Sequence, residues 1–260
     1  MNGHVPVRPP SIPLTPSHRI LDTLEPSLRI EADGTIHVWQ CSLDDADSCL
    51  DRFHSYLDAE ERLRASRFVH EMDRRRYIAA HGCLRALLAR YAGKPPAALP
   101  LGRSREGKPM LLQGSGFAAV SFNMSHSHGR MFLAVAKHRE VGADLELVRE
   151  DVETLKLAER FYTRAEYAAL TAQPSAQQTL RFFQYWVAKE AVLKGQGRGL
   201  PSLGECEVDF SVREPQTEIR ILAGSNMDKG WRVQWPLCGL GWTAAVAYRG
   251  TAILQGMPER

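Results

Sequence analysis

Two long stretches of the chain repeat apolar residues at the spacing of one helix face. Residues 177–194 contain neither proline nor glycine, and a glycine-rich segment follows at 195–199. Residues 73–91 show the same period, and residues 93–96 add a glycine and two prolines. Apolar residues at this spacing bury one side of a helix, and glycine and proline end helices. The pattern therefore predicts two long helices.

Shorter segments alternate or concentrate apolar residues as β-strands do. Strands are expected at residues 35–41, 110–112, 118–122, 131–137 and 141–146, and again near 207–212, 231–235 and 242–248. Two shorter helices are marked by capping boxes, in which an N-terminal Asp or Thr precedes a Glu by three residues. These boxes are Asp58 with Glu61 and Thr163 with Glu166.

The second half of the chain repeats the order of elements of the first. A capping box, a long helix and several strands follow one another twice, with little identity between the copies. Such a repeat predicts an α+β fold, a pseudo-dimer of two similar lobes, each a long helix packed on a small antiparallel sheet. We expect an N-terminal lobe at residues 28–139 and a C-terminal lobe at 140–260, with a functional site at the interface between them. Residues 1–27 hold six prolines and no apolar period, and predict a flexible extension.

Composition narrows the class of protein. The chain has 260 residues, of which 44% are hydrophobic and 24% are charged, and its net charge of +3 is too small to indicate nucleic-acid binding. Five cysteines are scattered without metal-site spacing, and apolar runs of about 18 residues are absent. These features predict a cytoplasmic protein that binds neither nucleic acid nor membrane.

Two pairs of charged residues are candidates for chemistry. On the second long helix, Glu190 and Lys194 lie on one face, as an exposed ion pair or as part of a site. On the expected strand 141–146, Asp144 and Glu146 leave the same face. Neighbouring carboxylates repel, and a hard cation such as Mg²⁺ is the simplest reason to place them together, although a solvated strand end is the alternative.

A third candidate is the segment Asn123-Met-Ser-His-Ser-His-Gly, which follows an expected strand. Small hydroxyl residues, histidines and a glycine form loops that bind anions through backbone N–H, hydroxyl and imidazole donors. The segment is therefore a candidate anion-binding loop, in which Ser125 and His126 precede a strand that leads toward Asp144, although a histidine in a turn is usually structural.

Five motifs, taken in order, resemble those of the 4′-phosphopantetheinyl transferase superfamily. They are Gly107-Lys-Pro, Asn123-Met-Ser-His-Ser, Gly142-Ala-Asp-Leu-Glu, Phe161-Tyr-Thr-Arg-Ala-Glu and the segment from Trp186 to Leu200, Trp-Val-Ala-Lys-Glu-Ala-Val-Leu-Lys-Gly-Gln-Gly-Arg-Gly-Leu. The size and the internal duplication are similar to the surfactin-synthetase type of this family, which is two-lobed and monomeric. The resemblance covers residues from about Arg76 to Leu200.

The resemblance implies an enzyme of the holo-[acyl-carrier-protein] synthase type. It would move the phosphopantetheine arm of coenzyme A onto a serine of an apo acyl or peptidyl carrier protein, with Mg²⁺, and release adenosine 3′,5′-bisphosphate. The motif positions imply metal ligands, catalytic residues and contacts to coenzyme A. The implied metal ligands are Asp144, Glu146 and Glu190; the catalytic residues are Glu190, Lys194 and His126; and the coenzyme A contacts are Arg76, Lys108, Ser125, His126 and Lys194.

Direct attack of the carrier serine on the β-phosphorus needs no nucleophile from the enzyme, so catalysis would consist of positioning and charge stabilisation. Either Glu146 or Glu190 could act as the general base. Arg74, Arg75 and Arg198 are candidates for receiving an acidic carrier. Two other functions stay open at this point: a non-catalytic module that binds coenzyme A or a carrier protein, and a Mg²⁺-dependent phosphoester hydrolase.

Overall fold

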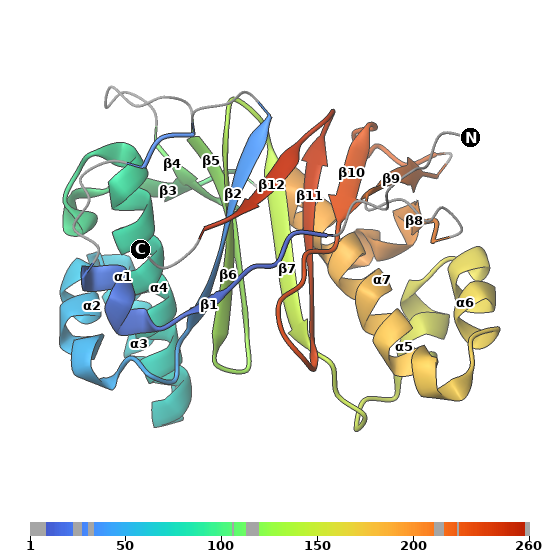
Figure 1. Cartoon of the computed structure of the whole chain (residues 1–260), viewed down its shortest axis with the longest axis horizontal. Helices are drawn as coiled ribbons and strands as arrows, with labels where there is room; N and C mark the ends of the chain where they lie inside the picture. Colours follow the sequence, from blue (N-terminus) through green and yellow to red (C-terminus); the bar gives the residue numbers. More distant parts are fainter. Residues whose placement is uncertain are drawn as a thin grey trace, which may run out of the picture.

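The protein is described here from a computed structural model. The structure describes residues 9–22, 28–30, 34–105, 107–112, 120–210, 216–222 and 224–257. Two five-stranded sheets lie side by side, and each carries a long helix (Figure 1). The fold predicted from the sequence, an α+β arrangement of two lobes, is confirmed.

Lobe 1 contains the helices α1 to α4, the strands β1 to β6 and the last strand β12. Its helices are α1 (Ser17–Asp22), α2 (Leu50–Tyr56), α3 (Ala59–Ala65) and α4 (Glu71–Ala92), with the short 3-10 helices η1 (Asp47–Cys49) and η2 (Pro96–Ala98). Its strands are β1 (Leu14–Thr15), β2 (Thr35–Ser42), β3 (Leu101–Arg103), β4 (Pro109–Leu111), β5 (Val120–Ser127), β6 (Arg130–Lys137) and β12 (Ile253–Gly256).

Lobe 2 contains α5 to α7 and β7 to β11. Its helices are α5 (Thr154–Phe161), α6 (Arg164–Thr171), α7 (Ser175–Gln196) and the 3-10 helix η3 (Leu200–Glu205). Its strands are β7 (Val141–Leu147), β8 (Cys206–Val208), β9 (Gln216–Ile221), β10 (Trp231–Gln234) and β11 (Trp242–Arg249). Within the described ranges, no helix combines the length and the apolarity that crossing a bilayer requires.

The two lobes repeat one arrangement of strands and helices. In lobe 1, β2 is followed by three helices and then, after the short strands β3 and β4, by β5 and β6, and β6 pairs with both β2 and β5. In lobe 2, β7 is followed by three helices and then by β10 and β11, after the short strands β8 and β9, and β11 pairs with both β7 and β10. The last strand of each repeat is therefore the central one, and all these pairs are antiparallel.

Both predicted capping boxes are present, and each one extends into a buried ion pair. The Glu61 carboxylate, from the box of α3, accepts a hydrogen bond of 2.6 Å from Arg85 of α4. Glu166, from the box of α6, accepts one of 2.6 Å from Lys189 of α7. Arg85 and Lys189 occupy the same place in their 22-residue helices. Each pair therefore fixes a short helix to the long helix of its lobe.

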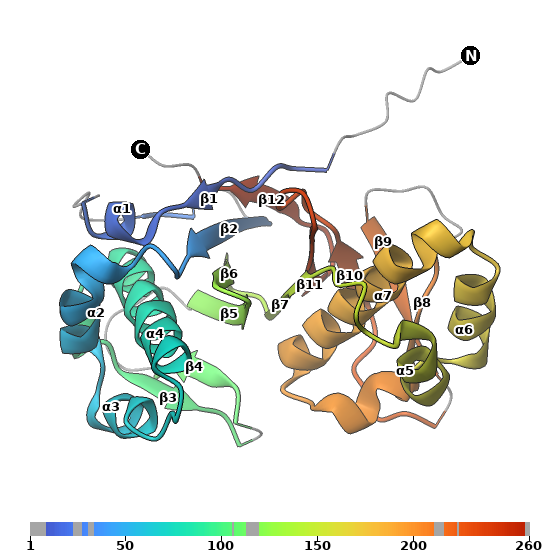
Figure 2. The same ribbon diagram turned by 90° about the horizontal axis from the view of Figure 1, so that it is seen from below.

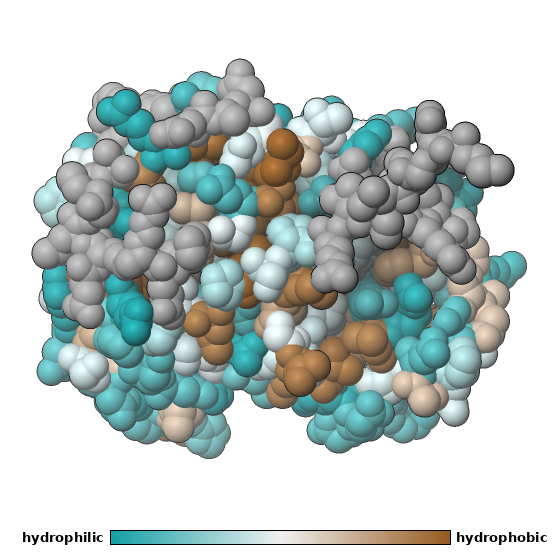
Figure 3. All heavy atoms as spheres, viewed as in Figure 1, coloured by the Kyte–Doolittle hydropathy of each residue, from teal (hydrophilic) through white to brown (hydrophobic). Residues whose placement is uncertain are grey.

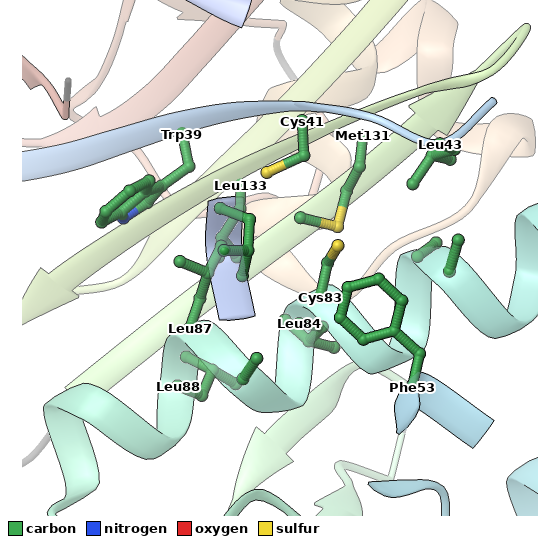
Figure 4. Close-up of a cluster of buried hydrophobic side chains, with 14 of the residues drawn as sticks. Trp39, Cys41, Leu43, Phe53, Cys83, Leu84, Leu87, Leu88, Met131 and Leu133 are labelled. Atoms are coloured by element: carbon green, nitrogen blue, oxygen red, sulfur yellow. The ribbon is translucent and has the colours of Figure 1, made fainter. Parts of the chain in front are cut away.

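Three apolar clusters hold the fold together. The first lies between α4 and the sheet of lobe 1, where Trp39, Cys41 and Leu133 meet Leu84 and Leu87 (Figure 4). The second lies between α7 and the sheet of lobe 2. The third joins the two sheets and includes side chains of β2, β6, β7 and β11, among them Ile36, Phe132, Ala143, Leu145 and Val246. Because this third cluster belongs to both lobes, it fixes their relative position.

The terminal segments cross from one lobe to the other. Residues 9–22 do not form the flexible extension that we expected for residues 1–27, because β1 pairs with β2 and Ile12, Ile20 and Leu21 are buried. The Ile12 N–H also donates to the Leu237 carbonyl oxygen of lobe 2, at 2.8 Å. β12, from the stretch that we assigned to the C-terminal lobe, pairs with β2 (Figure 2). Residues 1–8 and 23–27 lie outside the described residues.

The face that carries these segments is partly apolar. Figure 3 shows apolar side chains along its middle, whereas polar side chains cover most of the outer helices. Ile253, Leu237 and Leu240 are 71%, 55% and 101% exposed, respectively.

Two local expectations were wrong, and a third was wrong in its extent. The segment from Asn123 to Ser127 is not a loop: it continues β5, which pairs with β6 up to the two-residue turn His128–Gly129, where both residues have positive φ. Gly195 does not end the second long helix, which continues to Gln196 and ends with Gly197 in the left-handed conformation. The expected strand at 207–212 is shorter, and residues 211–215 lie outside the described residues.

The helix α7 approaches β7 so closely that one position must be glycine. A Cβ atom at Gly142 would lie 1.8 Å from the Ala191 carbonyl oxygen and 2.7 Å from the Gly195 nitrogen. Both of these are backbone atoms of α7, so a side chain could be accepted only if the whole helix moved. The position of α7 on its sheet therefore depends on Gly142.

We predict that Gly142→Ala destabilises the protein by about 1–3 kcal/mol or more, because the added methyl group forces α7 away from β7. Urea denaturation measures this change. Gly204→Ala is the control, since a Cβ there meets no atom within 4 Å. Equal midpoints for the two variants would contradict the prediction.

Glu61 also makes the stability of lobe 1 depend on pH. Burial opposes ionisation of its carboxyl group, but hydrogen bonds from His81 and the Asp58 backbone N–H, together with the charge of Arg85, outweigh burial and lower its pKa to about 2. A carboxyl group whose pKa is lower in the folded state stabilises that state above its unfolded pKa, near 4.5. This stabilisation is lost as the pH falls from that value toward 2.

We therefore predict that Glu61→Gln costs about 2–4 kcal/mol of unfolding free energy at pH 6, and that this difference shrinks steadily between pH 4.5 and pH 2.5. Denaturation of both proteins across this range measures it. The control is Glu60→Gln, at a neighbouring side chain that is 80% exposed. A difference that stays constant with pH would show that Glu61 acts only through its shape.

Candidate active site

Three elements from two lobes bring polar side chains together at the lobe interface: β5, β7 and α7. Alternation along β5 points Met124 toward the core of lobe 1 and Ser125 and Ser127 toward lobe 2. Alternation along β7 buries Ala143 and Leu145 in the shared core and turns the residues between and after them toward α7. The period-two pattern of each strand thus separates packing residues from polar ones.

A connected set of hydrogen bonds joins the lobes at this point. The Ser125 hydroxyl of β5 donates to Asp144 Oδ1 of β7 at 2.7 Å. Lys194 Nζ of α7 donates to the same oxygen at 2.5 Å and to Ser125 Oγ at 3.0 Å. Asp144 is buried, whereas the Lys194 side chain is 31% exposed. The ammonium group therefore lies at the edge of the site, next to a buried carboxylate.

Two further carboxyl groups adjoin this set. Glu146 accepts a hydrogen bond of 2.8 Å from the Ser127 hydroxyl. Burial, followed by the nearby charge of Asp144, raises the pKa of Glu146 and raises that of Glu190 to about 7. Burial of the Lys194 ammonium group acts to lower its pKa, but the nearby charges of Asp144 and Glu190 outweigh the effect of burial and raise the Lys194 pKa. Among the described residues, the site therefore concentrates three carboxyl groups around the Lys194 ammonium group.

The carboxylates are not fully paired by the described residues. Asp144 Oδ2 and Glu190 Oε1 are buried and have no hydrogen-bond partner among these residues. A buried carboxylate oxygen without a partner is costly, and a cation is the group that relieves this cost. The donor set, carboxylate oxygens alone, suits a hard divalent ion such as Mg²⁺.

A preformed metal centre is nevertheless not found. In the described ranges of the chain, no three His, Cys, Asp or Glu side chains are arranged to hold a metal ion. Asp144 Oδ1 is engaged by Lys194 and Ser125. The assignment of Asp144, Glu146 and Glu190 as joint ligands therefore stays a proposal, supported by the unpaired oxygens and by the effect of Asp144 and Glu146 on the pKa of Glu190.

Other predicted contacts of coenzyme A lie around this centre. His126 has an exposed side chain on β5. Neighbouring protein still removes part of the water around its imidazole, and this desolvation, followed by the charges of His81 and Lys194, lowers the His126 pKa. Arg76 of α4 forms a two-bond ion pair with Asp44, at 2.7 and 2.9 Å. These two residues are therefore not part of the hydrogen-bonded set.

Lys108, another expected coenzyme A contact, reaches across to lobe 2. Its ammonium group donates to two backbone carbonyl oxygens of lobe 2, those of Gly195 at 2.7 Å and Val141 at 3.2 Å. Lys108 thus contacts the end of α7 itself.

Two features of the structure were not predicted from the sequence. Ser127 was not assigned a role, although its position two residues after Ser125 puts it on the same face of β5. Arg64 and Arg67 line a pocket of about 420 Å³ with Leu63 and Phe68 at the corner between α3 and α4. The residues that line this pocket all lie in α3 and the segment directly after it.

Comparison with known proteins identifies the family. The model of the 4′-phosphopantetheinyl transferase superfamily matches residues 140–244, and the model of the 4′-phosphopantetheinyl transferase N-terminal domain matches residues 38–139. The chain is 36% identical to 4′-phosphopantetheinyl transferase HetI of Nostoc sp. over 190 residues, which are 73% of this chain and 80% of HetI. The chain belongs to the 4′-phosphopantetheinyl transferase superfamily. It is an enzyme of this transferase type, and the family uses coenzyme A and acts on carrier protein domains.

Relatives of the surfactin type align with the transferase as well. It is 32% identical to a 4′-phosphopantetheinyl transferase of Bacillus subtilis and 29% identical to 4′-phosphopantetheinyl transferase Sfp of Bacillus subtilis strain 168. Each alignment covers 58% of the transferase chain and 64% of the relative. The family resemblance inferred from the five motifs is confirmed.

We predict that Glu190→Gln makes the transferase more stable, by about 1 kcal/mol, when measured at pH 8 without divalent cations. The substitution removes one of three carboxylates that repel one another, and active sites often sacrifice stability in this way. Thermal unfolding measures the effect. Glu159→Gln, at an exposed position of α5, is the control and should change stability by less than about 0.5 kcal/mol. A clear loss of stability in Glu190→Gln would contradict this interpretation.

Proposed function

We propose that this transferase moves the 4′-phosphopantetheine arm of coenzyme A onto a serine of an apo acyl or peptidyl carrier protein, with Mg²⁺, and releases adenosine 3′,5′-bisphosphate. The observation that supports it best is the set formed by Ser125, Asp144 and Lys194, which joins the two lobes. The family match supports the type of reaction.

The reaction is a direct displacement at phosphorus. The oxygen of the carrier serine forms a bond to the β-phosphorus of coenzyme A, and the bond between this phosphorus and the bridging oxygen breaks. The serine proton passes to a carboxylate, for which both Glu146 and Glu190 are placed near the centre. Positioning and charge stabilisation supply most of the rate in reactions of this kind.

Each residue of the centre has a proposed part in this reaction. Lys194 lies at the exposed edge of the site, where its ammonium group would offset the charge that grows on the leaving phosphate. Ser125 holds Asp144 and Lys194 in place through its hydroxyl group. His126, exposed beside them on β5, would donate to a phosphate oxygen.

A divalent cation fits the acids of the site. Asp144 and Glu190 would hold Mg²⁺ through their unpaired oxygens, and Glu146 would bind it directly or through water. When bound, the ion would supply charge neutralisation at the pyrophosphate. The positive charge of the bound ion would also offset the repulsion among the three carboxylates.

A mass-spectrometric assay tests the proposal. Incubation of the transferase with coenzyme A, Mg²⁺ and purified apo acyl and peptidyl carrier proteins should add one phosphopantetheine to at least one carrier. Asp144→Ala and Glu190→Gln should each reduce the rate by at least about 100-fold, because each removes a group that acts at the reacting phosphate. Glu159→Gln should retain full activity.

A second measurement separates metal binding from turnover. Mg²⁺ should raise the unfolding temperature of the unsubstituted transferase and leave that of Asp144→Ala unchanged.

Full transfer activity in Asp144→Ala or Glu190→Gln would remove the site assignment. Release of phosphopantetheine without any carrier would favour a hydrolase, and binding of coenzyme A without turnover would favour a non-catalytic module.

A further inference from the structure

Lys108 connects the two lobes at a place that the proposed reaction does not explain. It directly precedes β4, in the hairpin that β3 and β4 form on lobe 1. Its side chain is partly buried and crosses to lobe 2. There its ammonium group donates to the Gly195 and Val141 carbonyl oxygens, at 2.7 and 3.2 Å.

The two carbonyl groups lie next to the close backbone contact between α7 and β7. Val141 precedes Gly142, and a side chain at Gly142 would collide with the backbone of Ala191 and Gly195. Lys108 therefore bridges the strand and the helix where their backbones touch. One ammonium group thus contacts both elements that carry the acids of the centre.

The contact also completes the C-terminus of α7. The last carbonyl groups of a helix have no partners within the helix. At this end, the Leu193 and Lys194 carbonyl oxygens accept hydrogen bonds from the Gly197 and Arg198 N–H groups, and the Gly195 oxygen accepts one from Lys108. A positive charge at this end of a helix is favourable because of the helix dipole.

The position of this contact ties it to the catalytic centre. Gly195 directly follows Lys194, whose ammonium group contacts Asp144 at 2.5 Å. Val141 lies three residues before Asp144 on the same strand. If the end of α7 loosens, the Lys194 ammonium group moves relative to Asp144, and a misplacement of about 1 Å can cost on the order of 100-fold in rate.

We propose that Lys108 is a positioning residue that latches the β3–β4 hairpin of lobe 1 to the end of α7 and the start of β7, and so holds Lys194 beside Asp144. This role differs from the coenzyme A phosphate contact that the family resemblance implies for Lys108. The catalytic consequence rests on the proposed function, whereas the latch itself is a property of the protein without substrate.

Amide hydrogen exchange in the substrate-free protein tests the latch directly. In Lys108→Met, the Gly197 and Arg198 amides should exchange at least about 10-fold faster, because they are the amides that close the last turn of α7. Exchange in the core of α4 should not change. Lys156→Met, which removes a lysine that is 74% exposed on α5 of lobe 2, is the control and should leave the Gly197 and Arg198 amides unchanged.

Kinetics separate the latch from a phosphate contact. Lys108→Met should lower kcat by about 10–100-fold and change KM for coenzyme A by less than about 3-fold, since the reacting groups are misplaced but the ligand is not lost. Lys108→Arg keeps donors for both carbonyl oxygens and should restore slow exchange and most of kcat. If Lys108→Met does not fold, amide exchange and kcat can be measured on Lys108→Arg instead.

Unchanged exchange at Gly197 and Arg198 in Lys108→Met, with a raised KM for coenzyme A, would overturn the proposal and favour the phosphate contact. The exchange result does not depend on turnover. If no carrier protein were modified, the proposed function would fail while faster exchange still supported the latch.

Discussion

The candidate active site holds three carboxyl groups close together in a partly buried place, and the rest of the structure must keep them there. The charge of Asp144 helps to raise the pKa of both Glu146 and Glu190, and the Lys194 ammonium group lies at hydrogen-bond distance from Asp144. A site of this kind is unfavourable unless the surrounding structure is rigid. The interface core between the sheets and the backbone contact of α7 with β7 provide that rigidity.

The duplicated architecture places this site between the lobes. Each repeat has a buried ion pair that fixes its long helix, Glu61 with Arg85 and Glu166 with Lys189. The acids and the lysine of the centre, however, belong to lobe 2 alone, whereas Ser125 comes from lobe 1. The duplication therefore supplied two similar scaffolds, of which one carries the charged groups and the other closes the site from the opposite side.

Contacts between the lobes complement the shared core. Residues 9–22 and β12 cross on one face, and Lys108 crosses to the end of α7. Each contact joins segments far apart along the chain. A change in the angle between the lobes would therefore disturb the Ser125–Asp144–Lys194 set, which relies on groups from both.

Local patterns in the sequence determined the two long helices, both capping boxes, the repeated order of elements and the same-face spacing of Asp144 with Glu146 and of Glu190 with Lys194. The helices, the capping boxes and the same-face pairs follow from the spacing of residue types within one element. The repeated order follows from comparing the elements of the two halves. Tertiary structure alone decided that residues 9–22 pack against β2, that Asn123–Ser127 continues a strand, that Lys194 faces Asp144 and that Lys108 contacts the backbone of α7. Such contacts depend on which faces of distant elements meet, and the free energy that selects them comes from burial and packing across the whole molecule.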